Sequence, residues 1–111
     1  MSALGEFEQL VLFAVLRLEE DASGVAIHDA IEARTGRDVS PGAIYTTLAR
    51  LEERGLVRSI VVTATSGRVG RPRKHYTLRP AGAKALRDAY DGIQALAVGL
   101  LPKLSDLAKG R

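Results

Sequence analysis

The chain has 111 residues, of which 46% are hydrophobic and 26% are charged, and its formal net charge is +3. This length suits one domain with a modest core, and the absence of cysteine excludes disulfide bonds and thiolate metal sites. The apolar run at residues 10–16 is too short to span a bilayer, which needs roughly 20 apolar residues. We therefore expect a cytoplasmic protein with no signal peptide and no membrane partner.

Charge is distributed very unevenly along the chain. Residues 1–33 carry one arginine against seven acids, whereas residues 34–79 carry ten bases against three acids. A polyanion would be attracted to the middle third and repelled by the first third. The plainer alternative is that these arginines are only a solvated face.

Two helices are predicted in the acidic first third. Residues 6–19 have apolar side chains at helical spacing, at Phe7, Leu10, Val11, Ala14 and Leu18. Most other positions of this helix are also apolar, so it needs one neighbour inside the domain and another elsewhere. Residues 25–34 predict a second helix, which follows a polar break at 21–24 and ends near Gly36.

A third helix is predicted to begin with Ser40 as its N-cap and Pro41 at its first position. Ile44, Leu48 and Leu51 form its buried stripe, and Gly55 ends it. The candidates for contact with DNA bases or phosphates on this helix are Ser40, Ala43, Tyr45, Thr46, Thr47 and Arg50. Alternatively, Tyr45 is a half-buried helix residue and the two threonines are surface filler.

A basic hairpin is predicted after this helix. Strand-like runs at residues 56–63 and 75–78 enclose a turn-rich loop that is too polar to be buried, and Tyr76 and Leu78 share one face of the second strand. A helix with a polar face followed by such a hairpin is the order of parts in a winged helix-turn-helix. The hairpin candidates for DNA contact are Arg68, Arg71, Arg73, Lys74 and His75.

A last helix is predicted from Pro80 to about residue 101, with Pro102 kinking or ending it. Its apolar residues from Leu86 to Leu107 alternate in steps of four and three, a heptad rhythm. We expect this stripe and the surplus surface of the first helix to form a homodimer interface, although the helix could instead fold back on its own domain. The dimerisation candidates are Phe7, Val11, Leu86, Tyr90, Ile93, Ala97, Leu100 and Leu101.

The predicted fold class is therefore α+β, mostly α. A winged helix-turn-helix DNA-binding domain spans residues 1–79, and a dimerisation helix spans residues 80–111. Enzymatic chemistry is not expected, because the two histidines are far apart in the sequence and no Cys/His cluster has metal-ligand spacing. His28 stands next to Asp29, and neighbouring helical side chains point about 100° apart, so we do not expect the carboxylate to support the ring. No metal or cofactor is expected.

Three motifs resemble the PadR family of bacterial transcriptional regulators. They are G-A-I-Y at 42–45, L-A-R-L-E-E-R-G-L-V at 48–57 and G-R-P-R-K-H-Y-T-L-R-P-A-G at 70–82. The resemblance covers residues 5–87, and the tail is similar to the subgroup with a single C-terminal helix. It implies a homodimeric repressor that binds a two-fold-symmetric operator, with Tyr45 and the wing bases facing DNA and the terminal helices forming the dimer. It also implies that a small apolar effector is possible.

The chain departs from the family pattern at three positions. Gly24-Val25 stands where the family commonly has Gly-Tyr, Thr46 replaces a frequent proline, and Arg79 replaces the threonine that usually caps the last helix. The alternatives are a regulator of another winged-helix family and a winged-helix protein-interaction module. The basic hairpin favours DNA, because an interaction module has no need of so many bases in one loop.

Overall fold

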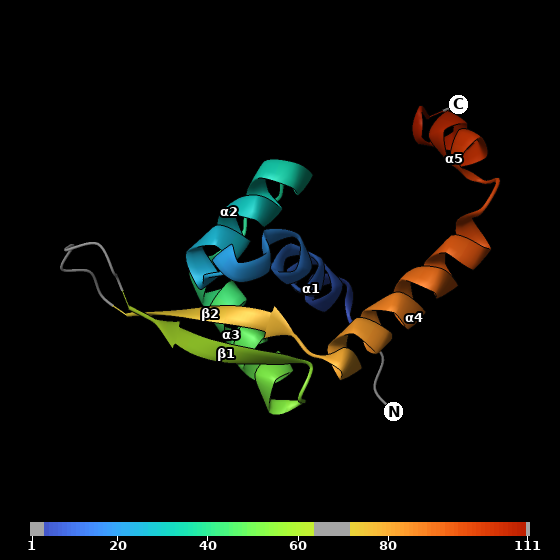
Figure 1. The fold of residues 1–111 in the computed structure, drawn as a ribbon. Helices are drawn as coiled ribbons and strands as arrows, with labels where there is room; N and C mark the ends of the chain where they lie inside the picture. The colour runs from blue at the N-terminus through green and yellow to red at the C-terminus, as the bar shows by residue number, and fades with distance from the viewer. Residues whose placement is uncertain (1–3, 64–71, 111) are drawn as a thin grey trace.

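The computed structural model describes residues 4–63 and 72–110 of the protein. Its elements, in chain order, are α1 (Glu6–Leu18), the 3-10 turn η1 (Glu19–Asp21), α2 (Gly24–Thr35), α3 (Pro41–Glu53), β1 (Val57–Val62), β2 (Arg73–Leu78), α4 (Pro80–Ala97) and α5 (Leu101–Ala108). Figure 1 shows α1, α2 and α3 gathered into a helical body, with the β1–β2 hairpin as the wing. The predicted fold, a mostly helical winged helix-turn-helix, is confirmed.

Local sequence signals set the ends of α2 and α3. Ser23 caps α2 by accepting a 3.1 Å hydrogen bond from the amide of Ala26, and Gly36 ends it with φ +69°. Ser40 caps α3 by accepting a 3.1 Å bond from the amide of Ala43, with Pro41 as the first helical residue. These caps satisfy amides that have no partner inside the helix, and they fix where each helix starts.

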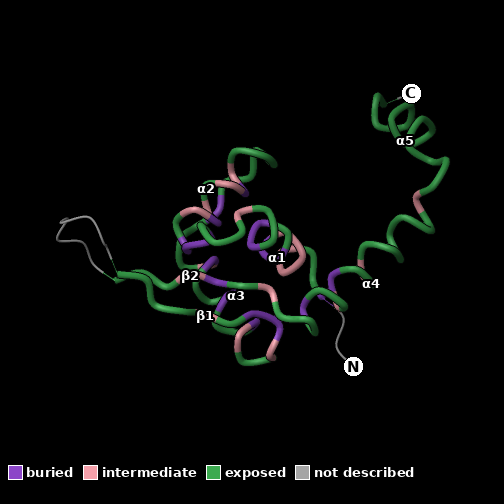
Figure 2. Tube along the Cα trace, in the orientation of Figure 1, coloured by how far each residue is buried: buried purple, intermediate pink, exposed green. Residues whose placement is uncertain are grey.

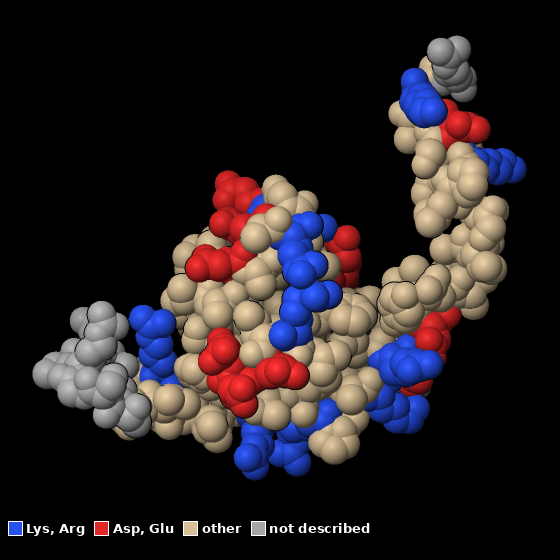
Figure 3. Space-filling model, turned by 45° about the horizontal axis from the view of Figure 1, so that its top comes forward, with Lys and Arg blue, Asp and Glu red and all other residues tan. Residues whose placement is uncertain are grey.

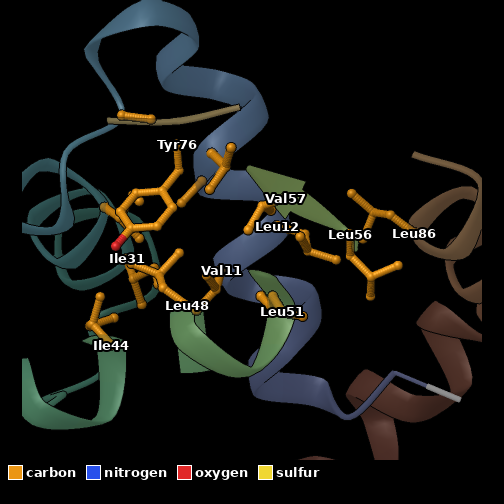
Figure 4. Close-up of a cluster of buried hydrophobic side chains, with 14 of the residues drawn as sticks. Val11, Leu12, Ile31, Ile44, Leu48, Leu51, Leu56, Val57, Tyr76 and Leu86 are labelled. Carbon is orange, nitrogen blue, oxygen red and sulfur yellow. The ribbon is translucent and has the colours of Figure 1, made fainter. Parts of the chain in front are cut away.

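The hydrophobic core lies between the three helices and the wing (Figure 4). Leu12 of α1 and Leu48 and Leu51 of α3 are fully buried in it. Val11 is also fully buried, so the prediction that it belongs to a dimer surface is wrong. Because α1 is apolar nearly all round, its sequence could not say which side chains the domain would enclose.

The wing is an antiparallel pair in which Val57 lies opposite Leu78 at the base and Val62 lies opposite Arg73 toward the tip. Tyr76 is buried while its neighbour Thr77 is exposed, which is the predicted alternation of faces. The Tyr76 amide donates to the carbonyl of Ala22 at 2.9 Å. This bond ties β2 to the segment that leads into α2.

The C-terminal part differs from its prediction. The single helix expected up to about residue 101 is interrupted, because α4 ends at Ala97 and Gly99 adopts φ +79°. Pro102 does not end a helix; it lies in the first turn of α5. This is where proline is tolerated, since its missing N–H would have no helical partner.

The first turns of α4 pack on the domain, and the rest projects from it. Leu86 is only 3% exposed and belongs to the core, so its assignment to a dimer surface is wrong. Beyond it, residues 87–110 form what we call the C-terminal arm, which is almost entirely exposed (Figure 2). The molecule extends 59 Å along its longest axis, with α5 standing away from the helical body rather than folding back on it (Figure 1).

Candidate nucleic-acid interface

The outward face of α3 differs in two residues from the face that the sequence suggested. Thr47 is only 8% exposed and turns toward the core beside Leu48 and Leu51, so its prediction as an exposed DNA-reading residue is wrong. Ala43 is half-buried and packs against the core. The exposed face consists instead of Ser40, Gly42, Tyr45, Thr46, Ala49 and Arg50.

Gly42 and Ala49 were missed by sequence reasoning, although a signal for them existed. At about 100° per residue they lie opposite the stripe of Ile44, Leu48 and Leu51. Both are small, so they let the helix backbone approach a nucleic-acid groove closely. Thr46 lies between them on the same exposed face.

Tyr45 is partly packed against the protein and partly open to a ligand, as both interpretations of its sequence position require. Its side chain is 49% exposed, yet its ring lies against the start of α2. A Cβ atom at Gly24 would come within 2.7 Å of the Tyr45 hydroxyl oxygen and 2.6 Å of Cζ. Only glycine at position 24 therefore lets the ring lie there. The contact restricts the ring while leaving one side open to a ligand.

Two side chains secure the root of the wing. Glu52 of α3 accepts hydrogen bonds from Ser59 of β1, at 3.2 Å from the amide and 2.7 Å from the hydroxyl. His75 of β2 is half-buried, and its Nδ1 lies 2.7 Å from the carbonyl oxygen of Glu20. His75 therefore anchors the wing to η1 through one of its two ring nitrogens.

Acids of α1 neutralise part of the basic middle third. Arg37 pairs with Glu6 at 2.9 Å and Arg54 pairs with Glu8 at 3.3 Å. In the part of the chain that the structure describes, no salt bridge involves the exposed bases of α3 and the wing, which are Arg50, Arg58, Arg73 and Lys74. Arg58, on the outward side of β1, was not among the predicted contacts. The predicted contacts Arg68 and Arg71 lie outside the described residues.

Basic side chains lie beside the wing and along the lower edge of the body in Figure 3, and others run across the middle of the body, with a cluster of acids among them. The bases beside the wing suit attraction of a polyanion to that part of the molecule. A groove of about 920 Å³ runs between α3 and β2, lined among others by Tyr45, Ala49, Arg73 and Lys74.

Tyr76 lies at the inner wall of this groove. Burial raises the pKa of Tyr76, and the nearby charge of Glu52 raises it further. Its hydroxyl therefore stays protonated under ordinary conditions. The groove offers hydroxyl, guanidinium and ammonium donors, which bind phosphate oxygens, beside the carboxylate of Glu52, which also lines it.

The structure contradicts the sequence argument about His28. Its Nδ1 lies 3.1 Å from Oδ1 of Asp29, and its Nε2 lies 2.7 Å from the carbonyl oxygen of Val39. The neighbouring carboxylate does reach the ring, and the other ring nitrogen contacts the carbonyl oxygen of Val39 in the loop before α3. His28 also stands 3.4 Å from Oε2 of Glu32, one turn further on.

Within residues 4–63 and 72–110, no group of three His, Cys, Asp or Glu side chains is arranged to hold a metal ion. None of the helices described is long and apolar enough to cross a membrane.

The comparisons with known proteins agree with the geometry. The sequence profile of the transcriptional regulator PadR-like family matches residues 12–88. No curated protein matches the chain. A PadR family transcriptional regulator from Eggerthella lenta DSM 2243 is 28% identical, with a TM-score of 0.66 over 89% of this chain and 86% of that one.

Two further solved structures are similar in fold. A PadR family transcription regulator from hypervirulent Clostridium difficile R20291 is 23% identical, with a TM-score of 0.72 over 90% of this chain and 99% of that one. A PadR-like transcriptional regulator from Bacillus cereus strain ATCC 14579 is 20% identical, with a TM-score of 0.71 over 95% and 93% of the two chains. At these identities the likeness establishes the fold alone.

Proposed function

Because the chain belongs to the PadR-like family of transcriptional regulators, we propose that it is a repressor that binds a palindromic operator as a homodimer. The observation that carries this proposal is the exposed polar face of α3 beside a wing whose bases have no acidic partner among the described residues. A regulator of this kind works where the chromosome is, so we propose a cytoplasmic location.

The division of labour follows from side-chain chemistry. Thr46 and Tyr45 lie where α3 would meet base edges in a major groove, with Arg50 at the margin for phosphate. Arg73 and Lys74 would contact the backbone, as would Arg68 and Arg71 of the wing loop. The helix offers few side chains for bidentate base recognition, so DNA shape and half-site spacing would carry much of the specificity.

Dimerisation is supported by the C-terminal arm. Its exposed large apolar side chains are Tyr90, Ile93, Leu96, Val98, Leu100, Leu101, Leu104 and Leu107. A soluble monomer rarely exposes so continuous an apolar surface, and a second copy would cover it. Phe7 is half-buried and Ala97 is partly exposed, so both remain available at the margins of this interface.

A small apolar effector is a subordinate proposal. A groove of about 540 Å³ lies between α1 and α4, lined among others by Phe13, Leu16, Leu86 and Tyr90. The rings of Phe13 and Tyr90 meet edge to face, with centroids 6.0 Å apart. Aromatic walls of this kind suit a flat apolar ligand. The same surface lies next to the proposed dimer interface.

The test begins by selecting operator sequences from random duplexes and then titrates the best one at several salt concentrations. We expect two chains per duplex, inverted half-sites about one helical turn apart, and affinity that falls steeply with salt. A scrambled duplex of equal length is the control. Binding that ignores salt, or that fails to distinguish the scrambled duplex, would contradict the proposal. It would favour a winged-helix protein-interaction module instead.

A further inference from the structure

Val39 is the residue immediately before the N-cap of α3, and α2 holds it from both sides. The amide of Val39 donates to Oε2 of Glu32 at 3.1 Å, and its carbonyl oxygen lies 2.7 Å from Nε2 of His28. The Val39 side chain is buried in the core. Ser40 follows directly and caps α3. The start of the recognition helix is thus fixed by two side chains of the preceding helix.

The geometry around His28 favours its protonated form. Oxygen acceptors face both ring nitrogens, with Oδ1 of Asp29 at 3.1 Å from Nδ1 and the Val39 carbonyl at 2.7 Å from Nε2. A neutral imidazole has one N–H and can donate to only one of them, whereas the imidazolium donates to both. In the neutral form that keeps the Val39 bond, a lone pair of Nδ1 would face the carboxylate.

Among the residues that the structure describes, two charged groups act on the ring, and both are acids of α2. They are Asp29 and, at 3.4 Å from Nε2, Glu32; from the loop before α3, the ring meets the uncharged Val39 carbonyl. The hydrogen bond to Asp29 is the largest cause that raises the pKa of His28 above its ordinary value, followed by the bond to Val39.

We propose that His28 is a positioning residue for DNA recognition, and that its protonated form holds the start of α3 in the orientation that binds the operator. The proposal rests on the proposed function, since it assigns α3 to the operator. No base or phosphate contact is required of His28 itself. It acts through the backbone of Val39 and through the Ser40 cap that follows.

The direction of the pH dependence follows from the sign of the shift. The hydrogen bond to Asp29 and the Val39 carbonyl raise the pKa of His28 above 6.5 in the folded protein, so the protonated form that holds α3 is lost as pH rises through this raised pKa. Operator affinity should therefore be highest below the raised pKa and fall as pH rises through it. We expect a decrease of about fivefold across the titration, the lower end of typical couplings between sites.

We call the contact between His28 and the Val39 carbonyl the latch. Three variants distinguish the latch from a general electrostatic effect of pH on DNA binding. His28→Gln keeps an N–H near the position of Nε2 but cannot titrate, so its affinity should lose the His28 component of the pH profile. His28→Ala removes the bond to Val39 and should weaken binding by about fivefold at pH 6. Asp29→Asn alters an exposed side chain, and it should move the midpoint of the profile to lower pH.

NMR on the free protein tests the latch without DNA. The ring signal of His28 is identified by its loss in His28→Gln, and the amide signals of Val39 and Ser40 should shift with the same midpoint as the ring. If these amides ignore the titration, or if His28→Gln retains the full wild-type pH profile, the inference is overturned. If the amides follow the titration but no duplex binds at any pH, the latch exists and the proposed function has failed instead.

Discussion

The helical body and the C-terminal arm use similar apolar side chains in opposite ways. In the body, Leu12, Leu48 and Leu51 are fully enclosed, whereas in the arm Leu101, Leu104 and Leu107 are each more than 60% exposed. The body therefore has its folding partner within the chain. The arm consists of the end of α4 and of α5, which lack such a partner, although most helical stability comes from tertiary packing. This contrast is the reason for our proposal that the arm packs against a second copy.

Deleting residues 88–111 should have the largest effect, because it removes the arm and leaves the body. The deletion leaves Leu86 in the core and removes the arm, so we expect a folded monomer where the full chain is a dimer at micromolar concentration. Operator affinity should decrease at least 100-fold, because two linked binding events become one. Sedimentation equilibrium and operator titration measure the two effects. A chain lacking only residues 109–111 is the control, and a truncated protein that still dimerises would refute the assignment.

A matched pair of leucines should show the difference in stability. Leu48→Ala removes a fully buried side chain and should cost about 2–5 kcal/mol of unfolding free energy, whatever the protein concentration. Leu104→Ala, at 61% exposure, should lower stability only in a concentration-dependent way, through the dimer. Thermal unfolding at several protein concentrations distinguishes them. Equal, concentration-independent losses would mean that the arm is not an intermolecular surface.

Substitutions of two glycines in α4 test where the body ends and the arm begins. A Cβ at Gly82 would collide with the backbone carbonyl of Leu56, so Gly82→Ala should destabilise the fold by about 1–3 kcal/mol. Gly92 has open space at that position, and Gly92→Ala should stabilise by about 0.5–1 kcal/mol through helix propensity. Chemical denaturation reports both values. If Gly82→Ala instead made the protein more stable, the boundary between body and arm would lie at another position.

The smallest expected effect separates the wing from α3. Arg73→Ala should weaken binding to every duplex about equally and reduce the salt slope by about one, because it would remove a proposed phosphate contact. Thr46→Ala should leave the salt slope unchanged and alter the preference among operator variants. Arg87→Ala, whose partner is Asp91 on α4, is the control for a generic loss of charge. Identical changes from the wing and helix variants would contradict the division of labour.

Much of the fold could be predicted because its signals are local. Ser40 and Pro41 mark the start of α3, Gly55 marks its end with φ +75°, and the stripe of Ile44, Leu48 and Leu51 is buried. These features depend on a few consecutive residues. The order of helix, hairpin and helix then restricts the fold to a winged helix-turn-helix.

The failures concern residues whose environment is set by distant parts of the chain. Thr47 lies beside the buried stripe, and nothing in its own sequence position tells whether the core extends far enough to enclose it. Gly99 and Pro102 together resemble a helix end followed by a new start, but the heptad rhythm runs across both and conceals the break. The ring of His28 is oriented by Val39, eleven residues away.

Leu56 connects the base of the wing to the start of α4. Its carbonyl accepts the amide of Arg79 at 2.9 Å and lies directly beneath Gly82, so the base of the wing and the first turn of α4 share one backbone junction. The junction rigidly connects the wing, which would follow DNA, to α4, which carries the arm. In the proposed dimer, the angle at which α4 leaves this junction would set the distance between the two α3 helices. Substitutions at this joint could thus change the length of operator accepted while leaving every DNA-facing side chain intact.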